Sequence, residues 1–293
     1  MTAAGAVRNS SGWRAELHLR FNGDIPDLLA NGDAPRSGVT RLVERRHEGP
    51  LVVQRPFHPE GDPCHVYLVH PPGGVVGGDE LRIDVQVDPR AHALITTPAA
   101  TKFYRCEQHR SAQTQELRAA GATLEWLPQE NIFYRGADVR TATRVHLDAH
   151  SRFIGWEINC LGLPARGERF DTGMLHLDLE LWKGSREAAS PVFLDRLRLA
   201  GESPARLAAW GLAGQEAVGT LLATPAGAAD VDLVREVLGQ HPFAAVSLVD
   251  GVLVLRALAP QAEALRHLFI AAWRALRPRI IGRDAVAPRI WST

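Results

Sequence analysis

The sequence predicts a mostly β protein, whose body is a sandwich, a barrel or an irregular stack of sheets, with a small C-terminal α+β portion that contains two helices. From Trp13 to about Leu199, apolar residues recur with a period of two far more often than 3.6, as strands require. Turn signals such as Asn22-Gly23 and Asp88-Pro89 interrupt these runs roughly every ten to twenty residues. Helical spacing is found in two segments near the C-terminus.

The alternating runs define the β-rich part of the chain. Residues 13–21 (WRAELHLRF) and 173–182 (GMLHLDLELW) both place apolar side chains at every second position. We therefore expect a flexible N-terminus at 1–12 and a β-rich body at 13–213. Because the chain contains no exact repeat, a regular propeller or solenoid is only one option for this body.

Two segments have the spacing of helices. Residues 230–239 begin with acidic side chains and end at a glycine, which predicts a short helix. Residues 260–277 place apolar side chains three and four positions apart, and Pro278 is expected to stop this second helix.

A hairpin is expected between the two helices. Asp250-Gly251 is the strongest short turn signal in the chain, and it separates the apolar runs 244–249 and 252–257. With a strand at 218–223, the order is strand, helix, hairpin, helix. Residues 214–293 therefore form an α+β portion, which we expect to be continuous with the body as one domain.

Composition excludes several classes of protein. With 293 residues, of which 45% are hydrophobic and 23% charged, the chain is typical of a globular protein. Basic and acidic residues are equal at 33 each, so no global field attracts nucleic acid or an anionic membrane. The chain has no long apolar run and no secretory signal, and its three widely spaced cysteines argue against a disulfide framework. These features predict a cytoplasmic protein.

Residues 70–79 (HPPGGVVGGD) form an unusual backbone segment. Gly73, Gly74, Gly77 and Gly78 allow positive φ angles and a close approach by another part of the chain or by a ligand. Asp79 and the following glutamate replace the Lys and Ser/Thr of a phosphate-binding loop, so nucleotide binding is not expected. The segment is either a loop shaped for close passage or a long turn between strands.

Two carboxylates lie in strongly apolar strands. Glu157 falls within FIGWEINC at 153–160, and Asp195 falls within VFLDRL at 192–197. An unpaired buried charge is costly, so each carboxylate requires a partner or water. One alternative is purely structural, with Glu157 paired to Arg152 and Asp195 paired to Arg196.

One local cluster has metal-binding character. It contains His58, Cys64, His65 and His70, but strand alternation puts Cys64 and His70 on one side and His65 on the other. Cys64 and His70 are therefore weaker metal candidates, and a packed thiol with hydrogen-bonded imidazoles is the alternative. The chain has no CxxC pair or HExxH helix, so a closed zinc site is not expected.

The sequence lacks the common motifs of enzymes. The chain contains no GxSxG turn and no recognisable catalytic-cysteine context, so no nucleophile is nominated and we predict that the chain is not an enzyme. Lys102, Tyr104 and Arg105 form a basic and aromatic patch that favours a protein interface over nucleic acid. Trp126 is either a core residue or an anchor against a partner.

Several ordered blocks together resemble one known family over nearly the whole chain, the urease accessory protein UreD, called UreH in some lineages. The blocks are HPPGGVVGGDEL at 70–81, TTPAATKFYR at 96–105, LEWLPQENIFYRGA at 124–137, INCLGLPARGE at 158–168 and PRIW at 288–291.

The resemblance implies an irregular, β-helix-like stack of sheets with two helices, and it implies a non-catalytic chaperone for nickel delivery. Members of this family bind apo-urease and UreF, connect through UreF to the GTPase UreG, and help to pass nickel to the urease site. It further implies a 2:2 hetero-oligomer with UreF, no permanently bound cofactor, and nickel(II) in transit along an internal water-filled route.

Four positions correspond to places where UreD sequences commonly carry acidic or hydroxyl groups: Asp79, Thr101, Glu157 and Asp195. We take them as candidate tunnel-lining residues, since scattered oxygen ligands replace some hydration water without trapping the ion. Two other hypotheses stay open, a structural clamp that opens apo-urease without contacting nickel and an unrecognised hydrolase.

Overall fold

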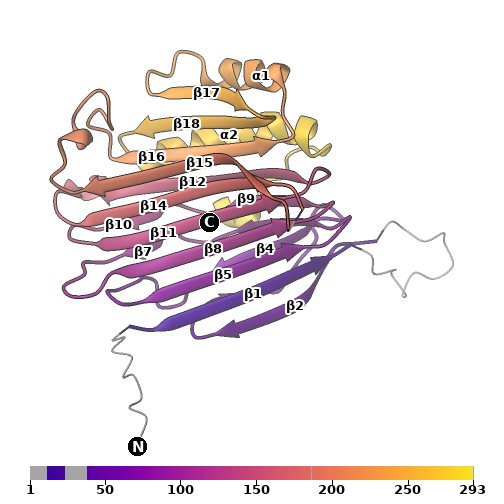
Figure 1. The fold of residues 1–293 in the computed structure, drawn as a ribbon, viewed down its shortest axis with the longest axis horizontal. Helices are drawn as coiled ribbons and strands as arrows, with labels where there is room; N and C mark the ends of the chain where they lie inside the picture. Colours follow the sequence, from indigo (N-terminus) through magenta and orange to yellow (C-terminus); the bar gives the residue numbers. More distant parts are fainter. Residues whose placement is uncertain (1–11, 24–37, 186, 293) are drawn as a thin grey trace, which may run out of the picture.

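The computed structural model describes residues 12–23, 38–185 and 187–292. Residues 1–11 of the predicted flexible N-terminus lie outside these ranges. In the described part of the chain, the fold is mostly β with two α-helices, as the sequence predicts, and two large sheets face each other (Figure 1).

The first sheet has seven strands. Their spatial order is β15 (Ser190–Ala200), β14 (Met174–Lys183), β11 (Asp138–Leu147), β8 (Ser111–Ala119), β5 (Glu80–Val87), β1 (Arg14–Asn22) and β2 (Arg41–Glu48).

The second sheet has eleven strands. Its main order is β17 (Ala244–Val249), β18 (Val252–Ala259), β16 (Ala217–Thr224), β12 (Arg152–Leu163), β9 (Thr123–Leu127), β6 (His92–Thr96), β4 (Cys64–Val69) and β3 (Val52–Val53). Three short strands pair beside this path, namely β10 (Asn131–Phe133), β7 (Thr101–Phe103) and β13 (Glu168–Arg169).

The chain passes back and forth between the sheets. From β4 to β14, its longer strands alternate between the two sheets, so neighbouring strands within each sheet run parallel. This winding is the β-helix-like arrangement expected from the sequence. It places residues from distant strands opposite one another across the interior.

Two hydrophobic layers hold the molecule together. One lies between the sheets, where β5 buries alternate residues such as Leu81, Ile83 and Val85. The other lies between the eleven-stranded sheet and the helices α1 (Ala228–Leu238) and α2 (Ala262–Ile280). Because β12 is covered on both faces, it is buried almost throughout and lacks a polar face.

The C-terminal portion follows the expected order. β17 and β18 form the predicted hairpin, in which Asp250 and Gly251 both have positive φ angles, as a tight hairpin turn requires. β16 pairs with β12, so the strands of residues 214–293 extend the eleven-stranded sheet.

The predicted end of the second helix is wrong. Pro278 does not stop α2, which continues to Ile280 with the proline inside its last turn. A proline there removes only one hydrogen bond near the helix end. The buried side chains of Arg277 and Ile280 hold this turn against the rest of the protein.

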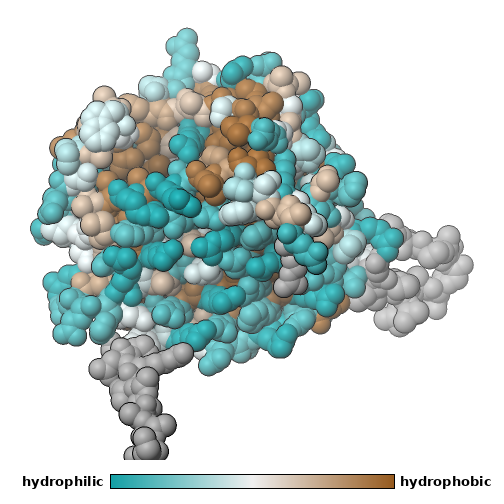
Figure 2. All heavy atoms as spheres, viewed as in Figure 1, coloured by the Kyte–Doolittle hydropathy of each residue, from teal (hydrophilic) through white to brown (hydrophobic). Residues whose placement is uncertain are grey.

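Three 3-10 turns complete the fold: η1 (Pro164–Arg166), η2 (Pro204–Arg206) and η3 (Arg289–Ser292). Neither helix within the described ranges combines the length and apolar character needed to cross a bilayer. Figure 2 shows a largely hydrophilic surface over the seven-stranded sheet, with apolar surface gathered in the upper part of the view, where β15 to β18 lie.

Candidate functional site: a cavity between the sheets

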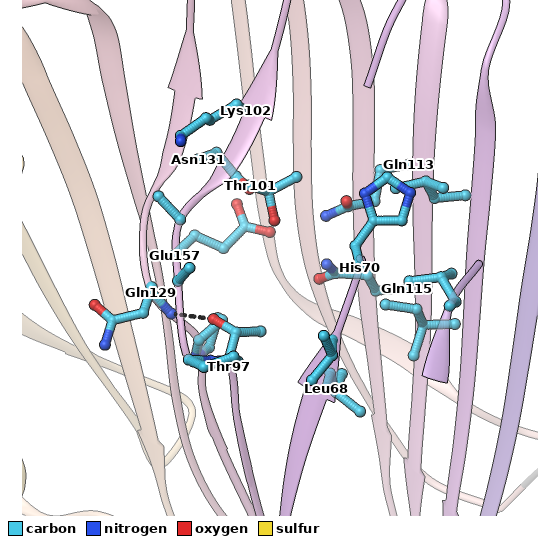
Figure 3. Close-up of a pocket in the computed structure, with 18 of the residues that line it drawn as sticks. Leu68, His70, Thr97, Thr101, Lys102, Gln113, Gln115, Gln129, Asn131 and Glu157 are labelled. Carbon is cyan, nitrogen blue, oxygen red and sulfur yellow. Dashed lines mark hydrogen bonds between the residues drawn. The ribbon is translucent and has the colours of Figure 1, made fainter. Parts of the chain in front are cut away.

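A cavity of about 160 Å³ lies between the two sheets (Figure 3). β5 and β8 form one wall, β4, β9, β10 and β12 contribute to the other, and the connection from β6 to β7 lies along it. The lining mixes apolar groups with polar ones. Its polar side chains include His70, Thr97, Thr101, Lys102, Gln113, Gln115, Gln129, Asn131 and Glu157.

The polar part of the cavity lining begins on β8, where polar residues occupy positions that face the core. Gln113 and Gln115 occupy buried positions of β8 where apolar residues would otherwise face the core. On the adjacent β11, Thr141 and Thr143 are their register partners and are buried as well. Sequence reasoning missed these residues, although the unbroken polar run QTQE at 113–116 was a readable signal.

A row of residues in register crosses the seven-stranded sheet from these positions to β15. In register, Thr143 of β11 lies beside Leu179 of β14, and Leu179 lies beside Asp195 of β15. We call this set the inner row: Gln115, Thr143, Leu179 and Asp195.

A second row faces it from the eleven-stranded sheet. Glu157 of β12 pairs in register with Thr220 of β16, and Thr220 pairs with Arg256 of β18. We call these three residues the facing row. The two rows touch at two places, since Thr143 contacts Glu157 and Asp195 forms an ion pair with Arg256.

Glu157 is the centre of this arrangement. Its side chain is buried, and among the described residues no Lys, Arg or His forms an ion pair with it. The expected partner, Arg152, instead donates a 2.6 Å hydrogen bond to the carbonyl of Ile280. Burial raises the pKa of Glu157 to about 7. Hydrogen bonds to the ionised carboxylate from Thr143 and Asn159 oppose this shift, and the negative charge of Asp195 reinforces it.

The hydrogen bonds around Thr143 favour a protonated Glu157. The Thr143 hydroxyl lies 2.8 Å from Gln115 Oε1 and also contacts Glu157 Oε1. A hydroxyl has one proton to donate, so it cannot serve both oxygens at once. A protonated Glu157 satisfies both contacts, because it donates to Thr143 and Thr143 donates to Gln115.

Glu157 also lines a second, smaller cavity. This space of about 40 Å³ is bounded by Glu157, Leu179, Asp195 and Thr220, among others. Glu157 therefore lies between the two cavities. Asp195 does not pair with Arg196, its neighbour in the sequence, but forms an ion pair with Arg256 at 2.9 Å. Arg196 instead lies beside Asp178 and Glu180.

The margin of the larger cavity carries two further candidates. His70, at the end of β4, and Thr101, at the start of β7, are both half-buried and both line the cavity. Burial lowers the pKa of the His70 imidazole, and the nearby Asp79 carboxylate opposes that shift. Figure 3 shows Thr101 close to Glu157, with His70 across from it near Gln113.

Asp79 lies outside the lining of both cavities. Its carboxylate accepts backbone N–H bonds from Trp13 at 2.8 Å and from Val76 at 3.0 Å. Asp79 thus ties the glycine segment to the beginning of β1.

Cys64 packs in the core between the sheets. Its side chain is fully buried, and burial raises the pKa of its thiol to about 12. A protonated thiol is a poor metal ligand. Within the described ranges, no three His, Cys, Asp or Glu side chains are grouped closely enough to hold a metal ion.

The glycine segment makes the close approach expected of it. A Cβ at Gly74 would lie 2.1 Å from the Tyr104 ring, and one at Gly77 would lie 2.8 Å from the His109 carbonyl. Gly73 and Gly78 have φ angles of 75° and 88°. Gly73 also lines the large cavity, so the segment borders its margin.

The interface candidates have different environments. Tyr104 is exposed and stacks on Tyr134 with ring centroids 5.0 Å apart, and the exposed Arg105 pairs with Glu107. Lys102 is half-buried at the cavity. Trp126 is buried in the core and lines the cavity, where its ring N–H has no hydrogen-bond partner among the described residues.

Fold and site together define a two-sheet β protein with an internal cavity of mixed apolar and polar lining and no preformed metal cluster in its described part. A sequence model of the UreD urease accessory protein family matches residues 15–292. The chain belongs to this family.

Several urease accessory proteins UreD are close relatives. The protein from Alkalilimnicola ehrlichii is 44% identical over 99% of this chain and 95% of its own length. That from Pseudomonas putida strain W619 is 41% identical over 97% of this chain and 96% of its own. That from Klebsiella aerogenes is 42% identical over 96% of this chain and 97% of its own.

Proposed function

We propose that this chain is a non-catalytic scaffold that delivers nickel(II) to apo-urease through its interior. In this proposal it binds apo-urease and UreF, connects through UreF to the GTPase UreG, and assembles with UreF in a 2:2 complex. Nickel is cargo rather than a resident cofactor. Family membership supports the role in urease maturation.

One observation carries the proposal of an internal route. Glu157, a buried carboxyl without a cationic partner among the described residues, lines two cavities and lies at the contact between the inner row and the facing row. A core residue with a purely structural role would be expected to have an ion-pair partner, because an unpaired buried carboxylate is costly.

The chemistry of the lining suits an ion in transit. A cavity of about 160 Å³ has room for several waters, each of which needs only about 10–15 Å³ of such volume. Amide, hydroxyl and carboxyl oxygens from Gln115, Thr101 and Glu157 replace some hydration ligands of Ni²⁺ without forming a closed cage. Glu157 exchanges its proton for the cation, since a divalent charge stabilises the carboxylate.

Replacing Glu157 tests this role. Glu157→Leu removes the carboxyl and places an apolar side chain of similar size at this buried position. Glu80→Gln, which removes an exposed carboxylate, is the control. We would coexpress each variant with urease and the other accessory proteins, then measure complex assembly by pull-down and the nickel content of urease. Normal assembly with a nickel content at least tenfold lower for Glu157→Leu supports the proposal.

Normal assembly with full nickel loading would defeat the internal route. That result would leave the structural clamp, which opens apo-urease without contacting nickel.

A further inference from the structure

At the end of the two rows farthest from His70 and Thr101, one ion pair joins the two sheets. Asp195 lies on β15, an edge strand of the seven-stranded sheet, and Arg256 lies on β18 of the other sheet. Their side chains meet at 2.9 Å, so the pair bridges the two sheets beside the smaller cavity that Asp195 lines.

This ion pair is easily broken. The Arg256 side chain is 54% exposed and the Asp195 side chain 31% exposed, and pairs in contact with solvent contribute little to stability. The guanidinium carbon of Arg256 also lies 5.6 Å from the centre of the Phe193 ring. That ring offers the cation a favourable contact that does not depend on Asp195.

The charges of the pair determine whether it repels or binds a cation that passes through the interior. With Arg256 in place, its positive charge lies at the end of the facing row and neutralises the nearest carboxylate. A divalent cation near Glu157 then meets repulsion and no free anionic ligand. When Arg256 moves away, Asp195 becomes a free oxygen ligand at the smaller cavity.

We propose that Arg256 is a gate for the internal route, closed while it is paired with Asp195 and open when it moves away. This inference rests on the proposed function. It assigns a role to Arg256, and it assigns Asp195 as the ligand that the gate exposes.

Two substitutions break the same pair with opposite expected effects. Arg256→Met removes the positive charge and leaves Asp195 free, so nickel should pass faster. Asp195→Asn removes the ligand and leaves the positive charge unpaired, so nickel should pass more slowly. A merely structural ion pair would give both variants effects of the same sign. Arg256→Lys retains the charge and should behave like the unmodified chain.

The experiment uses the full chain assembled with UreF, UreG and apo-urease. We would add nickel(II) and GTP, then follow the rate at which nickel becomes bound to urease. We expect at least a twofold increase for Arg256→Met, at least a twofold decrease for Asp195→Asn, and an unchanged rate for Arg256→Lys.

The outcomes separate the gate from the route. Equal rates for all three variants, or changes of the same sign for Arg256→Met and Asp195→Asn, would overturn the gate. If the gate is overturned but Glu157→Leu blocks nickel loading in the same assay, the internal route stands without the gate. Full loading by Glu157→Leu would remove both proposals.

Discussion

At the residue scale, the environment of Glu157 sets its protonation state. Burial raises its pKa from 4.5 to about 7, and the hydrogen bonds through Thr143 to Gln115 fit a protonated carboxyl. The folded protein therefore binds this proton more tightly than the unfolded chain does. The stabilisation is complete below pH 4.5 and is lost as the pH rises through about 7.

Glu157→Gln should make stability less dependent on pH. Glutamine stays neutral, so the variant avoids a destabilisation that reaches about 3 kcal/mol in the unmodified protein above pH 7. We would compare free energies of unfolding from urea denaturation at pH 4.5 and pH 8. The variant should gain relative stability between the two values, whereas the exposed control Glu80→Gln should not. An equal difference at both pH values would contradict the raised pKa.

At the element scale, the glycine segment depends on its contact with Tyr104. Gly74→Ala should destabilise the protein by about 1 kcal/mol, because the new methyl group overlaps the Tyr104 ring and displaces it from Tyr134. In a Tyr104→Ala background the same change should cost little. Urea denaturation of the four proteins in this cycle measures the coupling, and an identical cost in both backgrounds would exclude the clash.

Helix α2 is joined to the sheet by a buried charge network. Arg277 is fully buried and forms ion pairs with Glu60 at 2.6 Å and with Glu125 at 3.0 Å. Burial alone would raise the pKa of Glu125, but hydrogen bonds and charges from His92 and Arg277 outweigh it and lower the pKa to about 2. Both carboxylates therefore depend on this arginine for compensation.

Arg277→Met should cost about 3–5 kcal/mol at pH 7, because it removes the arginine from two buried carboxylates and leaves them only their histidine partners, His65 and His92. Arg274→Met, at an exposed position of the same helix, is the matched control and should cost less than about 0.5 kcal/mol. Unfolding free energies of both variants check this. A loss for Arg277→Met no larger than the control's would mean that the network contributes little.

At the scale of the whole molecule, the two buried cysteines are unsuited to nucleophilic chemistry. Burial raises the thiol pKa of Cys64 to about 12 and that of Cys160 to about 11, so both stay protonated and unreactive at neutral pH. The purified chain should show no turnover of esters, amides or phosphates. Turnover that a Glu157 or cysteine substitution abolishes would revive the hydrolase hypothesis.

The strand content, the hairpin and the two helices could be predicted from local patterns, since alternation and turn residues act over a few positions. The candidate site was only partly predictable. Glu157, Thr101 and His70 do line one cavity, but Gln115, Thr143 and Arg256 were missed. Each of these three gains its role from a strand distant in sequence.

What the sequence by itself determined is which side of each strand a residue occupies, because side-chain direction alternates along any strand. Only the tertiary structure decided which residues meet across the interior. Arg152 and Arg196 are near Glu157 and Asp195 in sequence, yet Thr143 and Arg256 contact these carboxyl groups instead. The physical reason is that contacts between facing sheets depend on how parallel strands stack in register, which no run of neighbouring residues encodes.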